Sequence, residues 1–432
     1  MSKPQLIARV RSKADVDAAV KAGFKAVDYN VDAAIPQDAV SGLEAYVNVA
    51  PSVLDTEAPE VKHGTTVYQA RLYSALNYVN ILWDLQKTAP LAVRDMDAAH
   101  LRLFIGSGYR ISTLRVRMSL LDRRCELNGL LQWCRENGVK VLAYDTEFGG
   151  FLDAAEGLKD TEEEGDGQNA SHAEYVRSAG GWDVFHTAIK ALDSVAHRHG
   201  VPLSALSAAY VASLGVDGIV LPPSAPKLPT LTTSDVDAIR AAVNDLKTPR
   251  GDPGDETKYP AYLSALPGDP KFNAHRAERI AEIERVAGLG GRIEASSGAR
   301  WEPVAEYSRG LRVGRFFEVA GTTARAHPSG KGCLGKDAED QATQIFDIVA
   351  GAVHAVGGDM RDVTRTRVLL KDVEDWPGQC KVHGRVFGRF GVRPVDTMVG
   401  GTVPIIEGSR VEIEALGVIG GHEGPLMRVG MC

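Results

Sequence analysis

Short apolar runs alternate with amphipathic stretches over the first 225 residues. The strand-like runs cover residues 6–10, 25–30, 45–51, 78–84, 101–106, 113–118, 139–145 and 217–223. Apolar residues at helical spacing fill several of the intervals between them, as at 125–138 and 183–200. Repeated strand–helix units predict a parallel sheet, and about eight of them predict a (β/α)8 barrel. The strand ends, where such barrels hold their chemistry, offer Asp28, Asp84, Asp145 and Ser224.

The pattern changes after a stretch rich in Pro, Gly and Asp at 247–273, which reads as a linker. A helix at 274–288 and a flexible break at 288–299 follow, so we place one domain at 1–290 and a second at 300–420. The second domain should contain a hairpin turning at Gly314, a helix at 337–358, a strand at 363–373, a helix at 376–391 and two closing strands. This order predicts an α+β domain with helices on one face of one sheet.

The closing stretch, residues 393–419, is the most informative part of the chain. It reads as two strands joined by a turn, and in 411–415 apolar residues alternate with Glu412 and Glu414. Asp396 lies on the first strand. The two segments could pair, which would bring Asp396 and Glu414 together as one wall of an active site.

Composition narrows the class of protein. The 432 residues are 44% hydrophobic and 24% charged, as in globular proteins, and are too many for one ordinary core. A net charge of -7 gives no basic surface for nucleic acid. No apolar run approaches the roughly 18 residues of a membrane span, and the N-terminus has no signal core. Five scattered cysteines without metal-ligand spacing favour a reduced, cytoplasmic protein.

Two stretches of the first domain, RISTLRVRM…DTEFGGFL (110–152) and AGGWDVF…IVLPPSA (179–225), resemble the aldo-keto reductases. That family reduces carbonyls with NADPH, using an Asp, a Tyr, a Lys and a His. The resemblance aligns Asp28 with the catalytic Asp, Asp84 with the His, and Ala33 with the Tyr proton donor.

The cofactor-binding positions of that family are altered as well. Leu114 and Arg115 align with the Asn-Gln pair that grips the carboxamide, and Met118 aligns with the Tyr that stacks on the nicotinamide. The comparison therefore implies a barrel that is retained without its reductase chemistry, and no cofactor is expected. An NADPH-dependent reductase with a second activity in the C-terminal domain is the alternative.

The second domain resembles the YjgF/YER057c/UK114 (Rid) family along its length. The segments that carry the resemblance are EYSRGLRVGRFFEVAG (306–321), VTRTRVLLKDVEDW (363–376) and VEIEA (411–415). The resemblance implies homotrimers with active sites in clefts between subunits. It also implies hydrolysis of reactive enamines and imines to ketoacids and ammonia.

Site residues follow from the family's Pro-Ala-Arg-Ser/Thr motif and its closing-strand Glu. Thr397 matches the motif, Glu414 matches the Glu, and Tyr307 matches a Tyr of the opening hairpin. Asp396 stands where the family has the Arg that binds a substrate carboxylate, which inverts the charge and argues for a substrate without that carboxylate. Glu414 would position water or act as base, Asp396 would be an acid or an amine anchor, and Tyr307 and Thr397 would donate hydrogen bonds.

The leading hypothesis is thus an enzyme of hydrolase or lyase type whose small-molecule substrate reacts in the Rid-like domain. The bifunctional reductase is the second. In the third, the barrel is a non-catalytic scaffold or ligand sensor on a Rid-like trimer.

Overall fold

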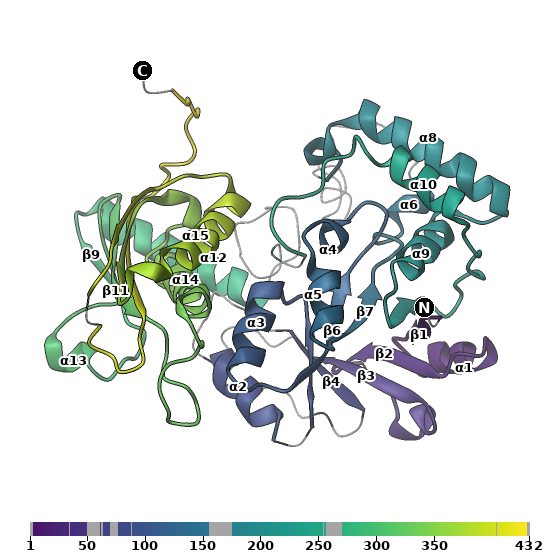
Figure 1. The fold of residues 1–432 in the computed structure, drawn as a ribbon, viewed down its shortest axis with the longest axis horizontal. Coiled ribbons are helices and arrows are strands. Elements are labelled where there is room, and N and C mark those ends of the chain that lie inside the picture. The colour runs from purple at the N-terminus through teal and green to yellow at the C-terminus, as the bar shows by residue number, and fades with distance from the viewer. Residues whose placement is uncertain are drawn as a thin grey trace.

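The N-terminal part of the chain forms a closed barrel of eight parallel strands, in a computed structural model that describes residues 3–33, 35–49, 61, 64–69, 77–87, 89–154, 175–253, 255, 270–402 and 404–429. Each strand pairs with the next, and the last pairs with the first (Figure 1). The strands are β1 (Gln5–Arg9), β2 (Ala26–Asn30), β3 (Glu44–Val49), β4 (Thr65–Gln69), β5 (Leu91–Arg94), β6 (Ile111–Arg117), β7 (Lys140–Tyr144) and β8 (Gly218–Leu221). The predicted (β/α)8 barrel is confirmed.

Helices surround this barrel. They are α1 (Lys13–Lys21), α2 (Asn77–Leu85), α3 (Ala98–Gly106), α4 (Arg124–Leu127), α5 (Leu130–Glu136), α6 (Phe151–Ala154), α8 (Trp182–His199), α9 (Leu203–Ser213) and α10 (Thr233–Ala242). Ser12 caps α1, as its position before the apolar spacing predicts, and accepts a hydrogen bond from the backbone of Asp15. None of the described helices is long and apolar enough to cross a membrane.

Two predicted barrel strands are wrong. Residues 78–84 and 101–106 lie in the helices α2 and α3, and the strands of this region are β4 and β5. Short apolar runs without alternation occur in buried helices as well as in buried strands, so the pattern alone could not separate them. Asp97 stabilises the start of the helix α3, because its carboxylate caps the backbone N–H groups of Ala99 and His100. Asp84 is consequently no strand-end residue but an exposed helix residue paired with Lys87.

The C-terminal domain is a six-stranded sheet with two long helices on one face. The strand order is β13-β12-β14-β11-β10-β9. Its elements are β9 (Arg292–Ala295), α13 (Glu302–Ala305), β10 (Gly310–Val313), β11 (Phe316–Thr323), α14 (Ala338–Ala355), β12 (Val363–Leu370), α15 (Trp376–Phe390), β13 (Val395–Val399) and β14 (Val411–Val418). The predicted α+β architecture is confirmed, including a hairpin that turns at Gly314 with φ 58. The helix α12 (Pro270–Gly288) precedes it.

Two expectations for this domain are corrected. The stretch 288–299, predicted as a flexible break, contains β9, which extends the sheet by pairing with β10. The closing strands do not pair with each other, because β12 lies between β13 and β14. β13 runs parallel to β12 and forms the edge of the sheet. A parallel pair needs a crossover connection, here α15, and that crossover moves β13 away from the strand that follows it.

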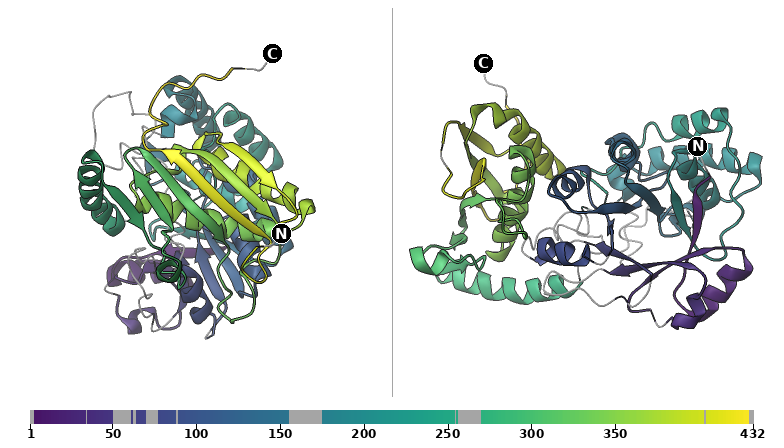
Figure 2. Two further views of the ribbon diagram at one scale, coloured as in Figure 1. Left: turned by 90° about the vertical axis from the view of Figure 1, so that its left-hand side faces the viewer. Right: turned by 60° about the horizontal axis from the view of Figure 1, so that its bottom comes forward.

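One face of this sheet is covered and the other is open. Alternate residues of β14, namely Val411, Ile413 and Ala415, are buried against α14 and the core around it. The helices α14 and α15 lie between the sheet and the barrel, so the open face points away from the barrel (Figures 1 and 2). Large apolar side chains remain exposed on this open face, including Phe316 at 70% and Val395 at 65%.

Buried charges join the two domains. His100 of α3 lies with its two ring nitrogens 2.7 Å from Asp97 and 3.0 Å from Asp347 of α14. Burial by itself would lower the pKa of His100, but the two carboxylates outweigh it and raise the pKa to about 9. Arg385 of α15 pairs with Asp97 at 2.9 Å, and the hydroxyl of Tyr78 donates to Asp347 at 2.8 Å. Buried ion pairs of this kind fix the relative position of the elements that carry them.

Candidate functional site

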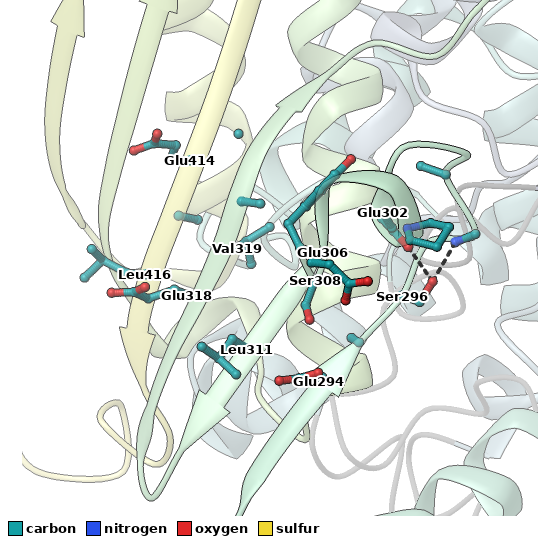
Figure 3. Close-up of a pocket in the computed structure, with 18 of the residues that line it drawn as sticks. Glu294, Ser296, Glu302, Glu306, Ser308, Leu311, Glu318, Val319, Glu414 and Leu416 are labelled. Atoms are coloured by element: carbon teal, nitrogen blue, oxygen red, sulfur yellow. Dashed lines mark hydrogen bonds between the residues drawn. The ribbon is translucent and has the colours of Figure 1, made fainter.

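An open pocket of about 1270 Å³ lies over the uncovered face of the C-terminal sheet (Figure 3). Its floor comes from β9, β10, β11, β12 and β14, and its wall from the segment around α13. That wall is held by Glu302, which accepts hydrogen bonds from the hydroxyl groups of Ser296 and Ser297. Carboxylates dominate the lining, since Glu294, Glu302, Glu306, Glu318 and Glu414 all contribute.

Glu414 is the lining residue with the clearest chemical environment. Its carboxylate oxygen accepts a hydrogen bond of 3.1 Å from Arg367, which stands opposite it on β12. Both side chains keep contact with solvent, at 40% exposure for Glu414 and 49% for Arg367. Tyr307 lines the same pocket, and its hydroxyl accepts a hydrogen bond of 3.2 Å from Arg309. The structure thus brings Glu414 and Tyr307 together, with a cation beside the carboxylate.

Asp396 lies elsewhere. In register it stands beside Thr366, on the sheet face opposite to Glu414. Its carboxylate accepts a hydrogen bond of 2.9 Å from the hydroxyl of Thr366, which is also 3.0 Å from Nε2 of His383 on α15. The expected proximity of Asp396 and Glu414 within one chain is therefore wrong. The expectation requires β13 and β14 to be neighbouring strands. β12 lies between them instead, so Asp396 and Glu414 are not cross-strand neighbours.

Thr397 shares the face of Glu414 without reaching the pocket. It stands beside Arg367 in register, and Arg367 in turn stands beside Glu414. Its hydroxyl accepts a hydrogen bond of 3.5 Å from Arg365 rather than donating one into the pocket. It is therefore close to the site but at the edge strand of the sheet.

Glu412 is a further candidate, which belongs to the alternating pattern of 411–415 but not to the predicted site. It lies two positions before Glu414 on the same face of β14. Burial and then the neighbouring Glu414 raise the pKa of Glu412, against an opposing effect of Arg309. The strict alternation of 411–415 was the signal that could have found it, because it puts two carboxylates on one face.

Among the described residues, the hydrogen-bond partners of Asp28 are an arginine and an asparagine. This carboxylate is buried and accepts hydrogen bonds of 2.8 Å from Arg115 and 3.0 Å from Asn48. Leu114, which precedes Arg115 on β6, is wholly buried. The expected loss of NADPH chemistry in the barrel stays a prediction. Asp145 pairs with Arg117 at 3.0 Å, and Ser224 lines a separate pocket of about 330 Å³.

Three carboxylates outside the pockets come close enough together to suggest a metal site: Asp97, Asp252 and Asp255. Arginines already neutralise them. Arg389 lies 3.5 Å from Asp252 and 3.2 Å from Asp255, and Arg385 lies 2.9 Å from Asp97. Their arrangement is that of ion pairs between the barrel side and α15.

Comparison with known proteins finds a family model that matches each part. Residues 76–247 match the model of the aldo/keto reductase family, and residues 297–419 match that of endoribonuclease L-PSP. A RutC family protein of Pyrococcus horikoshii is 29% identical over 87 residues, which are 20% of this chain and 68% of that protein. A 2-iminobutanoate/2-iminopropanoate deaminase of Rattus norvegicus is 29% identical over 129 residues, 30% of this chain and 88% of that protein.

A solved structure gives a further match. It is a protein of Mycobacterium tuberculosis described as a member of the highly conserved YjgF/YER057c/UK114 family. It is 34% identical to this chain over 30% of this chain and 100% of its own length, with a TM-score of 0.27.

Proposed function

Because this chain joins an aldo/keto reductase-like barrel to a C-terminal domain of the YjgF/YER057c/UK114 family, we propose that it is an enzyme acting on imine- or enamine-type small molecules in the C-terminal domain. The observation that carries the proposal is Glu414, which lies in the pocket beside Arg367 and Tyr307. The name of the rat relative, an imine deaminase, supports the same chemistry.

Hydrolysis of an imine needs a base for water and a proton for nitrogen. Glu414 takes a proton from water as the water oxygen bonds to the imine carbon, and the nitrogen gains a proton, which gives a carbinolamine. The amine nitrogen of the carbinolamine then takes the proton that Glu414 holds, the hydroxyl proton passes to the ionised proton donor of the first step, the C–N bond breaks, and ammonia leaves with the carbonyl product. Glu412 is suited to donate protons, because its raised pKa keeps more of it protonated than an ordinary Glu. Arg367 orients Glu414.

We further propose that the complete site forms between subunits of a homotrimer. Asp396 and Glu414 lie on opposite faces of one sheet, so only a second copy can bring Asp396 opposite Glu414. The exposed apolar side chains of the open face, Phe316 and Val395 among them, support such an assembly. Asp396 at the position of the family's Arg favours a substrate with a cationic nitrogen and no carboxylate.

Subunit complementation tests this arrangement. Asp396→Asn and Glu414→Gln are each expected to lower turnover of an imine generated in situ, measured as ammonia release. When the two variants are dissociated, mixed and reassembled, about a quarter of the clefts should contain both native residues. Turnover should then recover toward that fraction.

Mixtures that stay as inactive as the separate variants would exclude a shared site. Full activity of Glu414→Gln alone would exclude the proposed chemistry. Parallel assays with 2-iminopropanoate and with an imine that lacks a carboxylate decide the substrate class, and a clear preference for 2-iminopropanoate would contradict the role given to Asp396.

A further inference from the structure

The mouth of the barrel carries four arginines from three strands, of which β5 and β6 are neighbours and β1 is not. Arg9 ends β1, Arg94 ends β5, and Arg115 and Arg117 come from β6. Three of their guanidinium carbons surround the ring of Tyr144, at 4.6 Å for Arg94, 4.3 Å for Arg115 and 6.0 Å for Arg117. Cations so close together repel one another, and such an arrangement is typical of sites that hold a negative charge.

Nε of Arg94 and Nε of Arg115 are buried without an acceptor among the described residues, and of the nearby acceptors Oδ1 of Asn48 and Oε2 of Glu147 also lack a donor. A guanidinium has five N–H donors. Arg115, only 4% exposed, donates one hydrogen bond, to Asp28, and its Nε has no hydrogen-bond partner within the described chain. Arg94 donates one, to the hydroxyl of Tyr144, and its Nε lies 3.3 Å from Asp95 without forming a hydrogen bond. Asp28 already accepts from both Arg115 and Asn48. Buried donors without acceptors are unfavourable, so a ligand that supplies acceptors is stabilised here.

The four arginines differ in their exposure to solvent. The side chains of Arg94 and Arg117 are 20% exposed and that of Arg9 is 30% exposed, whereas that of Arg115 is 5% exposed. Arg115 is therefore the most deeply buried of the four. The pocket of about 330 Å³ that Ser224 lines begins beside the rim, at Glu147, the partner of Arg9.

We propose that the barrel mouth binds a small organic molecule through its carboxylate, with Arg94 and Arg115 as the binding residues. This site is distinct from the pocket in the C-terminal domain. A carboxylate fits better than a phosphate, because the arginines already face Asp28, Asp95, Asp145 and Glu147. A planar group with one negative charge accepts hydrogen bonds from the unpartnered N–H groups of the arginines. The four carboxylates repel such a group less than they repel a group with two negative charges.

Calorimetric titration of the full-length protein with propanoate, a monocarboxylate, at constant ionic strength tests the proposal. The wild-type protein should bind propanoate saturably, and Arg94→Met should weaken binding by at least about tenfold. Arg115→Met should also weaken binding. If this single variant does not fold because Asp28 is left without its partner, the double variant Asp28→Asn/Arg115→Met replaces it in the test. Arg11→Met, which removes an exposed arginine of the same barrel, is the matched control and should bind as the wild type does.

Three results would overturn the proposal. Absence of binding to the wild-type protein would do so directly. Loss of binding in Arg367→Met with retention in Arg94→Met would assign the anion to the C-terminal pocket. Inorganic phosphate binding at the mouth at least as tightly as propanoate would show that the site does not select carboxylates.

Discussion

Glu412 and Glu414 are the same residue type on the same face of β14, yet their surroundings differ. Glu414 has Arg367 beside it, whereas burial and Glu414 raise the pKa of Glu412. Such a difference between two neighbouring carboxylates is a common basis for dividing the roles of base and acid. The roles therefore follow from the neighbours of each residue rather than from residue type.

Replacing Glu414 by Gln should lower kcat on an imine substrate by a factor of about 10² to 10⁴, the usual contribution of a positioned acid or base. The free energy of unfolding should change little, since Glu414 is 40% exposed. Glu318→Gln, which changes another carboxylate of the same pocket, is the control. A comparable loss in both variants would indicate a general electrostatic effect instead of a specific role of Glu414.

The proposed role of Glu412 as proton donor predicts an alkaline limb in the pH–rate profile. If Glu412 donates a proton, kcat/KM should fall as pH rises through its raised pKa, because the ionised form cannot donate. Glu412→Gln should be slower at every pH and should lack that limb. A profile that Glu412→Gln leaves unchanged in shape would exclude this role.

At the scale of elements, alternating patterns and capping signals identify helices and strands more reliably than simple apolar runs do. The strand 411–418, the hairpin around Gly314 and the helix 338–355 form as predicted, because each has its own periodicity or turn signal. The runs at 78–84 and 101–106 lack such a signal and were mistaken for strands. The position of β13 depends on a crossover and on pairing between distant segments, which no local pattern contains.

Tyr307 and Glu414 could be found from sequence because their strands place them directly on the pocket. Arg367 could not, since its role depends on the register between β12 and β14.

The open sheet face yields a prediction about assembly. Phe316→Glu puts a charge in the middle of exposed apolar side chains, where burial of the Phe would contribute about 1.5–3 kcal/mol per copy. Light scattering should show a change from the proposed trimer to smaller species. Val304→Glu alters an exposed apolar residue of α13 and serves as the control. Unchanged mass for Phe316→Glu would place the subunit contacts on another surface.

At the scale of the whole molecule, the barrel and the C-terminal domain meet through charges that water cannot reach. His100 is 2% exposed and lies between Asp97 and Asp347, so the contact depends on the protonated imidazole. Docking of the two domains should therefore respond to pH, while each core, being apolar, should not.

The sign follows from the raised pKa of His100. The stabilisation is complete below the unfolded pKa of about 6.5 and is lost as pH rises toward and through about 9. It is on the order of a few kcal/mol. Denaturant unfolding at pH 6 to 10 should show this loss in the wild-type protein and a flatter curve in His100→Gln. Equal pH dependence in both proteins would contradict the assignment.

Arg312 has a practical consequence for anyone who wishes to express the C-terminal domain alone. The family match begins at residue 297, which would be the natural cloning boundary. Arg312 is 2% exposed, and its guanidinium is held by Glu284 of α12 at 2.7 Å and 2.9 Å. A fragment starting at 297 would lose Glu284 together with β9, leaving a buried cation without its counter-ion and β10 as a bare sheet edge. Fragments that begin before α12 should therefore be the soluble ones.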